Sequence, residues 1–81
     1  MPSKSVIVGS SVGLHARPAA IISEAAGGLG VTINGVDAAS SLMIMTLGAK
    51  FGDTVEVAGD DEAAVDTIAH LVEQDLDADA E

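Results

Sequence analysis

A histidine and the only arginine of the chain lie two residues apart in the segment GLHARP, residues 13–18. Gly13 permits a tight turn, and Pro18 suits the first turn of a helix, where a missing N–H costs little. The start of a helix presents unpaired N–H groups and a partial positive charge, which together attract anions. The segment therefore predicts a histidine that can be phosphorylated, with its phosphate held by helix amides and a guanidinium.

The reactivity of His15 depends on its neutral ring, because a protonated imidazole is not a nucleophile and the ordinary pKa is about 6.5. We expect the Arg17 guanidinium and the helix start to disfavour the protonated ring, so that the neutral form persists near neutral pH. After phosphorylation, the amides of Ala16 and Arg17 are expected to bind the phosphate. The guanidinium adds a charge-assisted hydrogen bond of roughly 1.5–3 kcal/mol.

The composition predicts one small domain, residues 1–81, with an aliphatic core. Hydrophobic residues make up 48% of the chain, yet Phe51 is the only aromatic residue. The chain contains no cysteine, so we expect neither disulfides nor thiolate metal sites. No signal-peptide pattern precedes Val8 and no stretch reaches membrane-spanning length, which predicts a soluble, cytoplasmic protein.

The charge balance is strongly acidic, with 13 acidic residues and a net charge of −10. The cations are Lys4, Arg17 and Lys50. This balance argues against binding to nucleic acid or to an anionic membrane, because both need a basic face. Most of the carboxylates are interpreted as a solvated acidic surface.

Hydrophobic spacing and turn residues predict the elements that must position His15. Helical spacing begins after the histidine and stops at Gly27-Gly28, and Asn34-Gly35 is a strong two-residue hairpin signal. The predicted strands are Ser3 to Val8, Val31 to Ile33, Val36 to Ala38 and Thr54 to Ala58. The predicted helices are Ala16 to Ala26, Ser40 or Ser41 to about Leu47, and one capped by Asp60 or Asp61, with a core stripe of Val65, Ile68, Ala69, Val72 and Leu76.

This order, β-α-β-β-α-β-α, predicts an α+β fold: an open-faced two-layer sandwich in which three helices cover one face of a four-stranded antiparallel sheet. Polar Thr32 and Glu56 alternate with apolar residues, as expected for a sheet with one solvated face. The residues from Leu42 to Leu47 are apolar nearly all round, and a helix of two turns cannot bury every side.

GLHARP, together with the run ASSLMIMTLG at residues 39–48, resembles the two signatures of the HPr family, the histidine-containing phosphocarriers of the bacterial phosphotransferase system. The resemblance covers essentially the whole chain. It implies that His15 is phosphorylated on Nδ1, that Arg17 contacts the phosphate and that Ser40 is a regulatory phosphorylation site. The implied donor is phosphorylated enzyme I, and the implied acceptors are EIIA components of sugar permeases, with a serine kinase acting on Ser40.

The expected docking surface for these partners borders the predicted site, and methionine suits a surface that meets several partners. Ser40 and Ser41 compete for the capping and regulatory roles, and Met43 stands where the family often has a small residue. We expect a monomer, no cofactor and no metal, with His70 as a solvated histidine near Asp66. The expected docking residues are Ala16, Arg17, Ala20, Leu42, Met43 and Met45.

Other functions remain open at this stage. The chain can be a regulatory binding protein on the same scaffold, controlled through Ser40, or a carrier in a nitrogen-regulatory branch of the relay. A small hydrolase with a nucleophilic His15 would need a second acid or base, and no carboxylate lies near it in the sequence. We therefore expect a transfer intermediate, not a stand-alone catalyst.

Overall fold

The computed structural model describes residues 2–9, 13–14 and 16–74. Along this part of the chain, strands and helices follow one another in the predicted order β-α-β-β-α-β-α. The strands are β1 (Ser3–Ile7), β2 (Thr32–Ile33), β3 (Val36–Asp37) and β4 (Thr54–Ala58), and the helices are α1 (Ala16–Ala26), α2 (Ser41–Thr46) and α3 (Glu62–Glu73).

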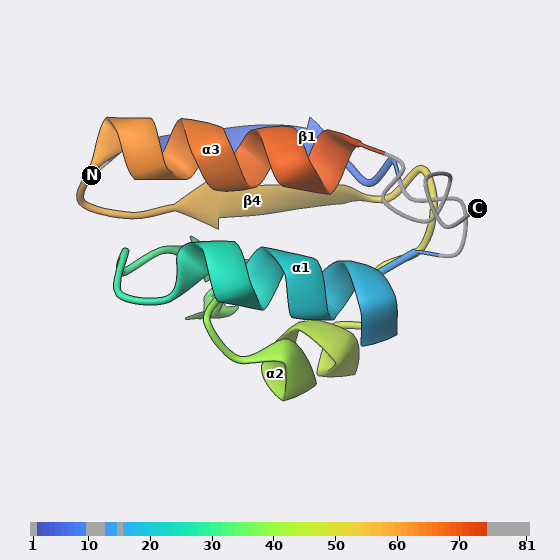
Figure 1. Cartoon of the computed structure of the whole chain (residues 1–81). Coiled ribbons are helices and arrows are strands. Elements are labelled where there is room, and N and C mark those ends of the chain that lie inside the picture. The colour runs from blue at the N-terminus through green and yellow to red at the C-terminus, as the bar shows by residue number, and fades with distance from the viewer. Residues whose placement is uncertain (1, 10–12, 15, 75–81) are drawn as a thin grey trace.

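The sheet has the strand order β1-β4-β2-β3, and every neighbouring pair is antiparallel. The helices lie on one face of this sheet, with α3 over β1 and β4, and with α2 beside α1 (Figure 1). None of the three helices in the described part of the chain covers the other face. The predicted open-faced sandwich is therefore confirmed.

Alternation along the strands decides which side chains enter the core. Val6 lies opposite Val55 in the register of β1 and β4, and both are buried. Ser5 lies opposite Glu56 on the solvated face, and both are exposed. The core is aliphatic, as predicted, and its large fully buried members include Val8, Ile22, Val31, Ile33, Ile44, Val57, Ile68 and Val72.

The hairpin between β2 and β3 forms at the predicted residues. Asn34 has a φ of 49° and Gly35 a φ of 86°, the left-handed angles that a tight two-residue turn requires. The Asn34 side chain also accepts a hydrogen bond from the Glu56 N–H, 2.8 Å away, which ties the turn to β4. The first three strands are each one residue shorter than predicted, because Val8, Val31 and Ala38 lie just outside the ladders.

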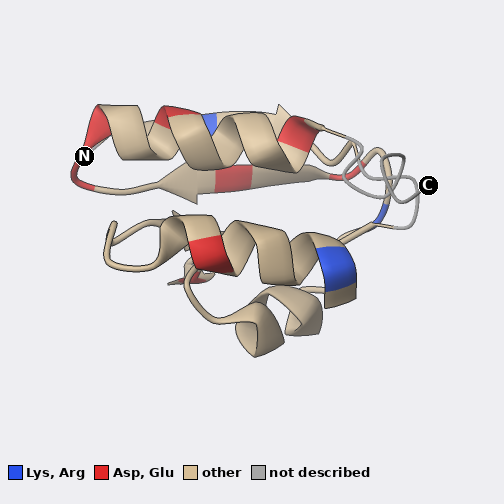
Figure 2. Cartoon of the chain, viewed as in Figure 1, with Lys and Arg blue, Asp and Glu red and all other residues tan. Residues whose placement is uncertain are grey.

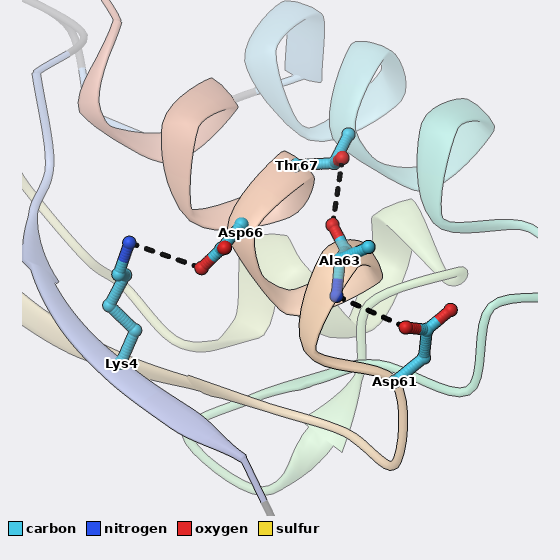
Figure 3. A network of polar contacts seen from close by, with 5 residues as sticks. All are labelled: Lys4, Asp61, Ala63, Asp66 and Thr67. Carbon is cyan, nitrogen blue, oxygen red and sulfur yellow. Dashed lines mark hydrogen bonds and ion pairs between the residues drawn. The ribbon is translucent and has the colours of Figure 1, made fainter.

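Helix α3 is capped by Asp61, one of the two predicted candidates. The Asp61 carboxylate accepts a hydrogen bond from the Ala63 N–H at 3.1 Å, as Figure 3 shows. The buried stripe of α3 contains Val65, Ile68, Ala69 and Val72 as predicted, and also Ala64. Leu76 and the acidic tail lie outside the described residues.

Lys4 connects the edge strand β1 to α3. Its Nζ lies 3.1 Å from a carboxylate oxygen of Asp66, and both side chains are about half exposed (Figure 3). An exposed pair of this kind contributes at most about 1 kcal/mol. Lys4 is one of the three cations of the chain, and this ion pair holds its side chain against α3, away from the start of α1.

No helix in the described part of the chain is both long and apolar enough to cross a membrane.

Candidate functional site

The loop that leads into α1 is held against the segment that follows α2. Leu14 donates its backbone N–H to the Ala49 carbonyl oxygen, 3.0 Å away, and its side chain is buried. Gly13 has a φ of +79°, and a Cβ there would lie 2.6 Å from the Ala49 oxygen and 3.0 Å from the Cα of Lys50. Only glycine accommodates both this conformation and this approach. The two segments are therefore fixed relative to each other.

Helix α1 begins at Ala16, so Arg17 is its second residue. Both residues are exposed, whereas Pro18 and Ala19 are buried and hold the first turn against the core. The first turn contains no acidic side chain, and Figure 2 shows a blue segment, the colour of Lys and Arg, at the start of α1. The helix dipole adds roughly half a positive charge at the same place. The arrangement suits the binding of an anion in front of α1.

His15, the predicted phosphorylation site, lies outside the described residues. Its neighbours in the sequence are described: Leu14 belongs to the anchored loop, and Ala16 begins α1. The roles predicted for His15, Ala16 and Arg17 in binding phosphate remain predictions.

Ser40, the predicted regulatory residue, is the N-cap of α2. Its Oγ accepts a hydrogen bond from the Met43 N–H at 3.3 Å, and its carbonyl oxygen accepts the Ile44 N–H at 3.1 Å. Ser41 is the first residue of the helix. The capping role left open between the two serines therefore belongs to Ser40, while its phosphorylation stays a prediction.

Helix α2 turns one residue into the core and leaves its large apolar neighbours outside. Ile44 is fully buried, whereas Leu42, Met43 and Met45 are exposed by 67%, 42% and 37%. As predicted, this helix of about two turns does not bury every side, and Ile44 is its one buried residue.

All six expected docking residues are exposed, and they come from two helices that pack against each other. We call this set the α1–α2 surface. It consists of Ala16, Arg17 and Ala20 of α1, and of Leu42, Met43 and Met45 of α2.

One segment beside the start of α1 was not among the predicted site residues. The turn of residues 50–53 follows directly on Ala49, and it carries Lys50 and the exposed Phe51. In the sequence, the only signal was that one of three cations and the only aromatic residue are adjacent. The contact with Gly13 depends on the tertiary structure.

The second histidine lies apart from this region. His70 is exposed in the last turn of α3, as predicted, while the Asp66 carboxylate is paired with Lys4. Among the residues that the structure describes, no three histidine, cysteine or carboxylate side chains are grouped so that they can hold a metal ion.

Comparison with known proteins gives consistent results. A family model described as the PTS HPr component phosphorylation site matches residues 2–74. The phosphocarrier protein HPr of Streptomyces coelicolor is 39% identical over 87 residues, covering 95% of this chain and 94% of that protein.

Solved structures of similar proteins share the fold. An HPr-C-His structure from Thermoanaerobacter tengcongensis has a TM-score of 0.80 and 28% identity, covering 90% of this chain and 92% of that one. A histidine-containing phosphocarrier protein described for Mycoplasma has a TM-score of 0.70 and 27% identity, covering 98% and 96%.

The open-faced sandwich and the exposed start of α1 are those of a small phosphocarrier protein. The chain belongs to the HPr family, whose members are phosphocarriers of the phosphotransferase system. Its role is that of a phosphocarrier in this system, and its partners are proteins of the same system.

Proposed function

We propose that this chain accepts a phosphoryl group from phosphorylated enzyme I on His15 and passes it to EIIA components of sugar permeases. In each transfer, a bond forms between phosphorus and the accepting nitrogen as the bond between phosphorus and the donor atom breaks. The proposal assigns the accepting role in the chain to Nδ1 of His15. The observation that carries it is the exposed Arg17 in the first turn of α1, beside an anchored loop that ends next to His15.

The start of α1 supports both steps, acceptance of the phosphoryl group from the donor and its release to the acceptor. Phosphoryl transfer through a loose transition state needs mainly positioning and stabilisation of charge. The helix start contributes about 0.3–1 kcal/mol toward an exposed anion, and a guanidinium hydrogen bond roughly 1.5–3 kcal/mol. These contributions hold a phosphoryl group without trapping it, as a carrier requires.

Ser40 supports a second, regulatory proposal on the same molecule. It lies at the start of α2, two residues before the exposed Leu42 of the α1–α2 surface. Phosphorylation would place close to two negative charges beside an apolar docking surface, which costs desolvation when a partner binds. We therefore propose that phosphorylation of Ser40 by a serine kinase weakens docking.

The test is intact-mass measurement after incubation with enzyme I and phosphoenolpyruvate. We expect one added phosphate that is labile in acid, and no addition to His15→Ala. Arg17→Gln is expected to be phosphorylated at least about tenfold more slowly, as loss of a charge-assisted bond predicts. Lys4→Gln is the matched control, since Lys4 is paired with Asp66 and is expected to leave the rate unchanged.

A wild-type chain that gains no mass, with enzyme I active on another carrier, would overturn the phosphocarrier mechanism proposed here. Transfer from the phosphorylated chain to purified EIIA components then tests the second half-reaction. Transfer only to a component of a nitrogen-regulatory relay would replace the sugar permeases as acceptors.

A further inference from the structure

Gly9, two residues beyond the end of β1, lies directly against the last turn of α3. Its N–H donates a hydrogen bond to the Val72 carbonyl oxygen at 3.0 Å. A Cβ at position 9 would overlap the carbonyl oxygen of Glu73 and would lie 2.6 Å from its carbonyl carbon. Among the glycines of the described residues, none is approached more closely by another segment.

Space, and not backbone conformation, requires a glycine at this position. Gly9 is not among the glycines with a positive φ. The atoms that approach it belong to the backbone of α3, so no flexible side chain can move aside for a larger residue. Because interiors are close-packed, any side chain at position 9 must push the end of β1 away from α3 or displace the last turn of the helix.

Two further hydrogen bonds tie the end of β1 to the segment before β4. The Val8 N–H donates to the Asp53 carbonyl oxygen at 2.8 Å, and the Gly52 N–H donates to the Val8 carbonyl oxygen at 3.0 Å. Two consecutive residues, Val8 and Gly9, are thus bonded to two different segments. Backbone groups held in this way lose much of their conformational freedom, so the direction in which the chain leaves β1 is fixed.

The chain that leaves Gly9 leads to the proposed phosphorylation site. Residues 10–12 lie outside the described residues, and beyond them Leu14 donates its N–H to the Ala49 carbonyl oxygen at 3.0 Å. Gly9 and Leu14 are therefore fixed points on either side of this connection. A short connection between fixed ends has few conformations open to it. The place of Gly9 thus restricts the backbone that precedes His15.

Helix α3 is a rigid support for the first of these fixed points. Its buried stripe holds it on the sheet, and it also packs against α1. Figure 1 shows that α3 ends, and α1 starts, at the same end of the molecule. Reacting groups are placed most precisely when rigid elements support them. A loop tied to the last turn of α3 therefore starts at a constant place relative to the start of α1.

Building on the proposed function, we propose that Gly9 is a positioning residue for His15. By letting the end of β1 lie against α3, it sets where the loop before His15 begins, and so holds the imidazole in place relative to Arg17. Gly9 acts through the loop and contacts neither the phosphate nor the partner. Transfer is sensitive to such positioning, because a displacement of about 1 Å can cost about 10²-fold in rate.

Rapid-quench measurement of transfer from phosphorylated enzyme I to Gly9→Ala tests this role. We expect the maximal transfer rate to fall about tenfold to hundredfold. The half-saturating concentration should change less than about twofold, because the α1–α2 surface is not altered. Transfer from the phosphorylated variant to EIIA components should slow by a similar factor, since the same imidazole reacts in both steps.

Gly59→Ala is the matched control for a loss of stability. A Cβ at Gly59 would lie 3.2 Å from the Gly30 carbonyl oxygen and 3.3 Å from the Val31 side chain, which is also a tight fit. Gly59 follows β4 at the end of the sheet where β1 begins, away from Gly9. We expect this variant to be less stable but to keep the wild-type transfer rate, and thermal unfolding compares the two variants.

A second pair of variants changes the helix side of the contact, in case Gly9→Ala does not fold. Glu73 is exposed, and Glu73→Gly and Glu73→Ala both remove its carboxylate. Only the glycine also loosens the backbone of the last turn. We expect the maximal transfer rate to fall about two- to fivefold in Glu73→Gly and to stay at the wild-type value in Glu73→Ala.

A folded Gly9→Ala variant with the wild-type maximal rate would overturn this inference alone, and so would equal rates in the two Glu73 variants. An equal loss of rate in Gly59→Ala, or a change in the half-saturating concentration only, would also overturn it. A wild-type chain that active enzyme I never phosphorylates would remove the proposed function and this inference together.

Discussion

Arg17 and Gly13 shape the start of α1 in different ways. Arg17 contributes a positive charge that no acidic side chain of the first turn offsets. Gly13 contributes space, because it lets the loop approach the Ala49 backbone in a left-handed conformation. A charge at this position is useful only if the loop is in place, so the glycine has a positioning role in the site.

Replacement of Gly13 by alanine tests this role, with Gly28→Ala as the matched control. Both glycines have a φ of +79°, but a Cβ at position 28 meets nothing within 4 Å, while one at position 13 meets the Ala49 oxygen at 2.6 Å. We expect Gly28→Ala to cost about 1–2 kcal/mol of unfolding free energy for the backbone conformation alone. Gly13→Ala should cost about 1–3 kcal/mol more, because of the steric overlap.

Urea denaturation measures both costs, and phosphorylation by enzyme I measures the effect on the site. Of the two variants, only Gly13→Ala is expected to slow phosphorylation, since Gly28 follows the far end of α1. Equal losses of stability in the two variants would show that the close approach to Ala49 is not a constraint.

At the scale of elements, α2 combines a structural and a docking function in six residues. Ile44 attaches the helix to the core, and Ser40 caps its start, while Leu42 and Met45 remain exposed. A helix this short is marginal by itself, so its orientation depends on the cap and on this one buried side chain. Loss of the cap should therefore weaken the element that carries half of the α1–α2 surface.

Substitutions at Ser40 separate its capping role from its regulatory role. Ser40→Ala removes the acceptor for the Met43 N–H and is expected to lower the unfolding free energy by about 1 kcal/mol. Ser40→Asp retains a good N-cap and should stay near wild-type stability, yet its charge should raise the KM for enzyme I. Denaturation and enzyme I kinetics measure the two effects. A Ser41→Ala variant as unstable as Ser40→Ala would contradict the assignment of the cap.

At the scale of the whole molecule, charge is distributed unevenly. Acidic side chains are spread over α3, β4 and the connecting segments (Figure 2). Arg17 lies at the start of α1, and Lys50 shares the turn of residues 50–53 with Asp53. The folded chain has a radius of gyration of 11.0 Å, so its excess carboxylates lie close to one another. Self-repulsion of this kind opposes the compact state and is screened by salt.

We therefore expect the folded state to become more stable as salt is added. The Debye length falls from about 30 Å at 0.01 M to about 8 Å at 0.15 M ionic strength, which should raise the midpoint of thermal unfolding. Lys4→Gln adds one unit of net negative charge and removes the Asp66 ion pair, so its stabilisation by salt should be larger. A midpoint that is constant or falls with sodium chloride would show that repulsion is not significant here.

Local signals in the sequence were sufficient for the order of elements, the bounds of α1 and β4, the Asn34-Gly35 hairpin and the two family signatures. These features depend on a few neighbouring residues: the spacing of apolar positions, a left-handed turn, or glycines after a helix. The composition likewise predicted the aliphatic core.

Only the tertiary structure decided which surfaces meet. The sequence left the cap of α2 open between Ser40 and Ser41, and it gave no sign that Ala49 and Lys50 lie beside Gly13. It also did not show that Asp66 pairs with Lys4. The Gly13 contact and the Lys4–Asp66 pair join segments far apart in the chain, and the packing of helices on the sheet sets their geometry. The cap is a local contact, but both serines suit it, so the start of α2 had to be known to choose between them.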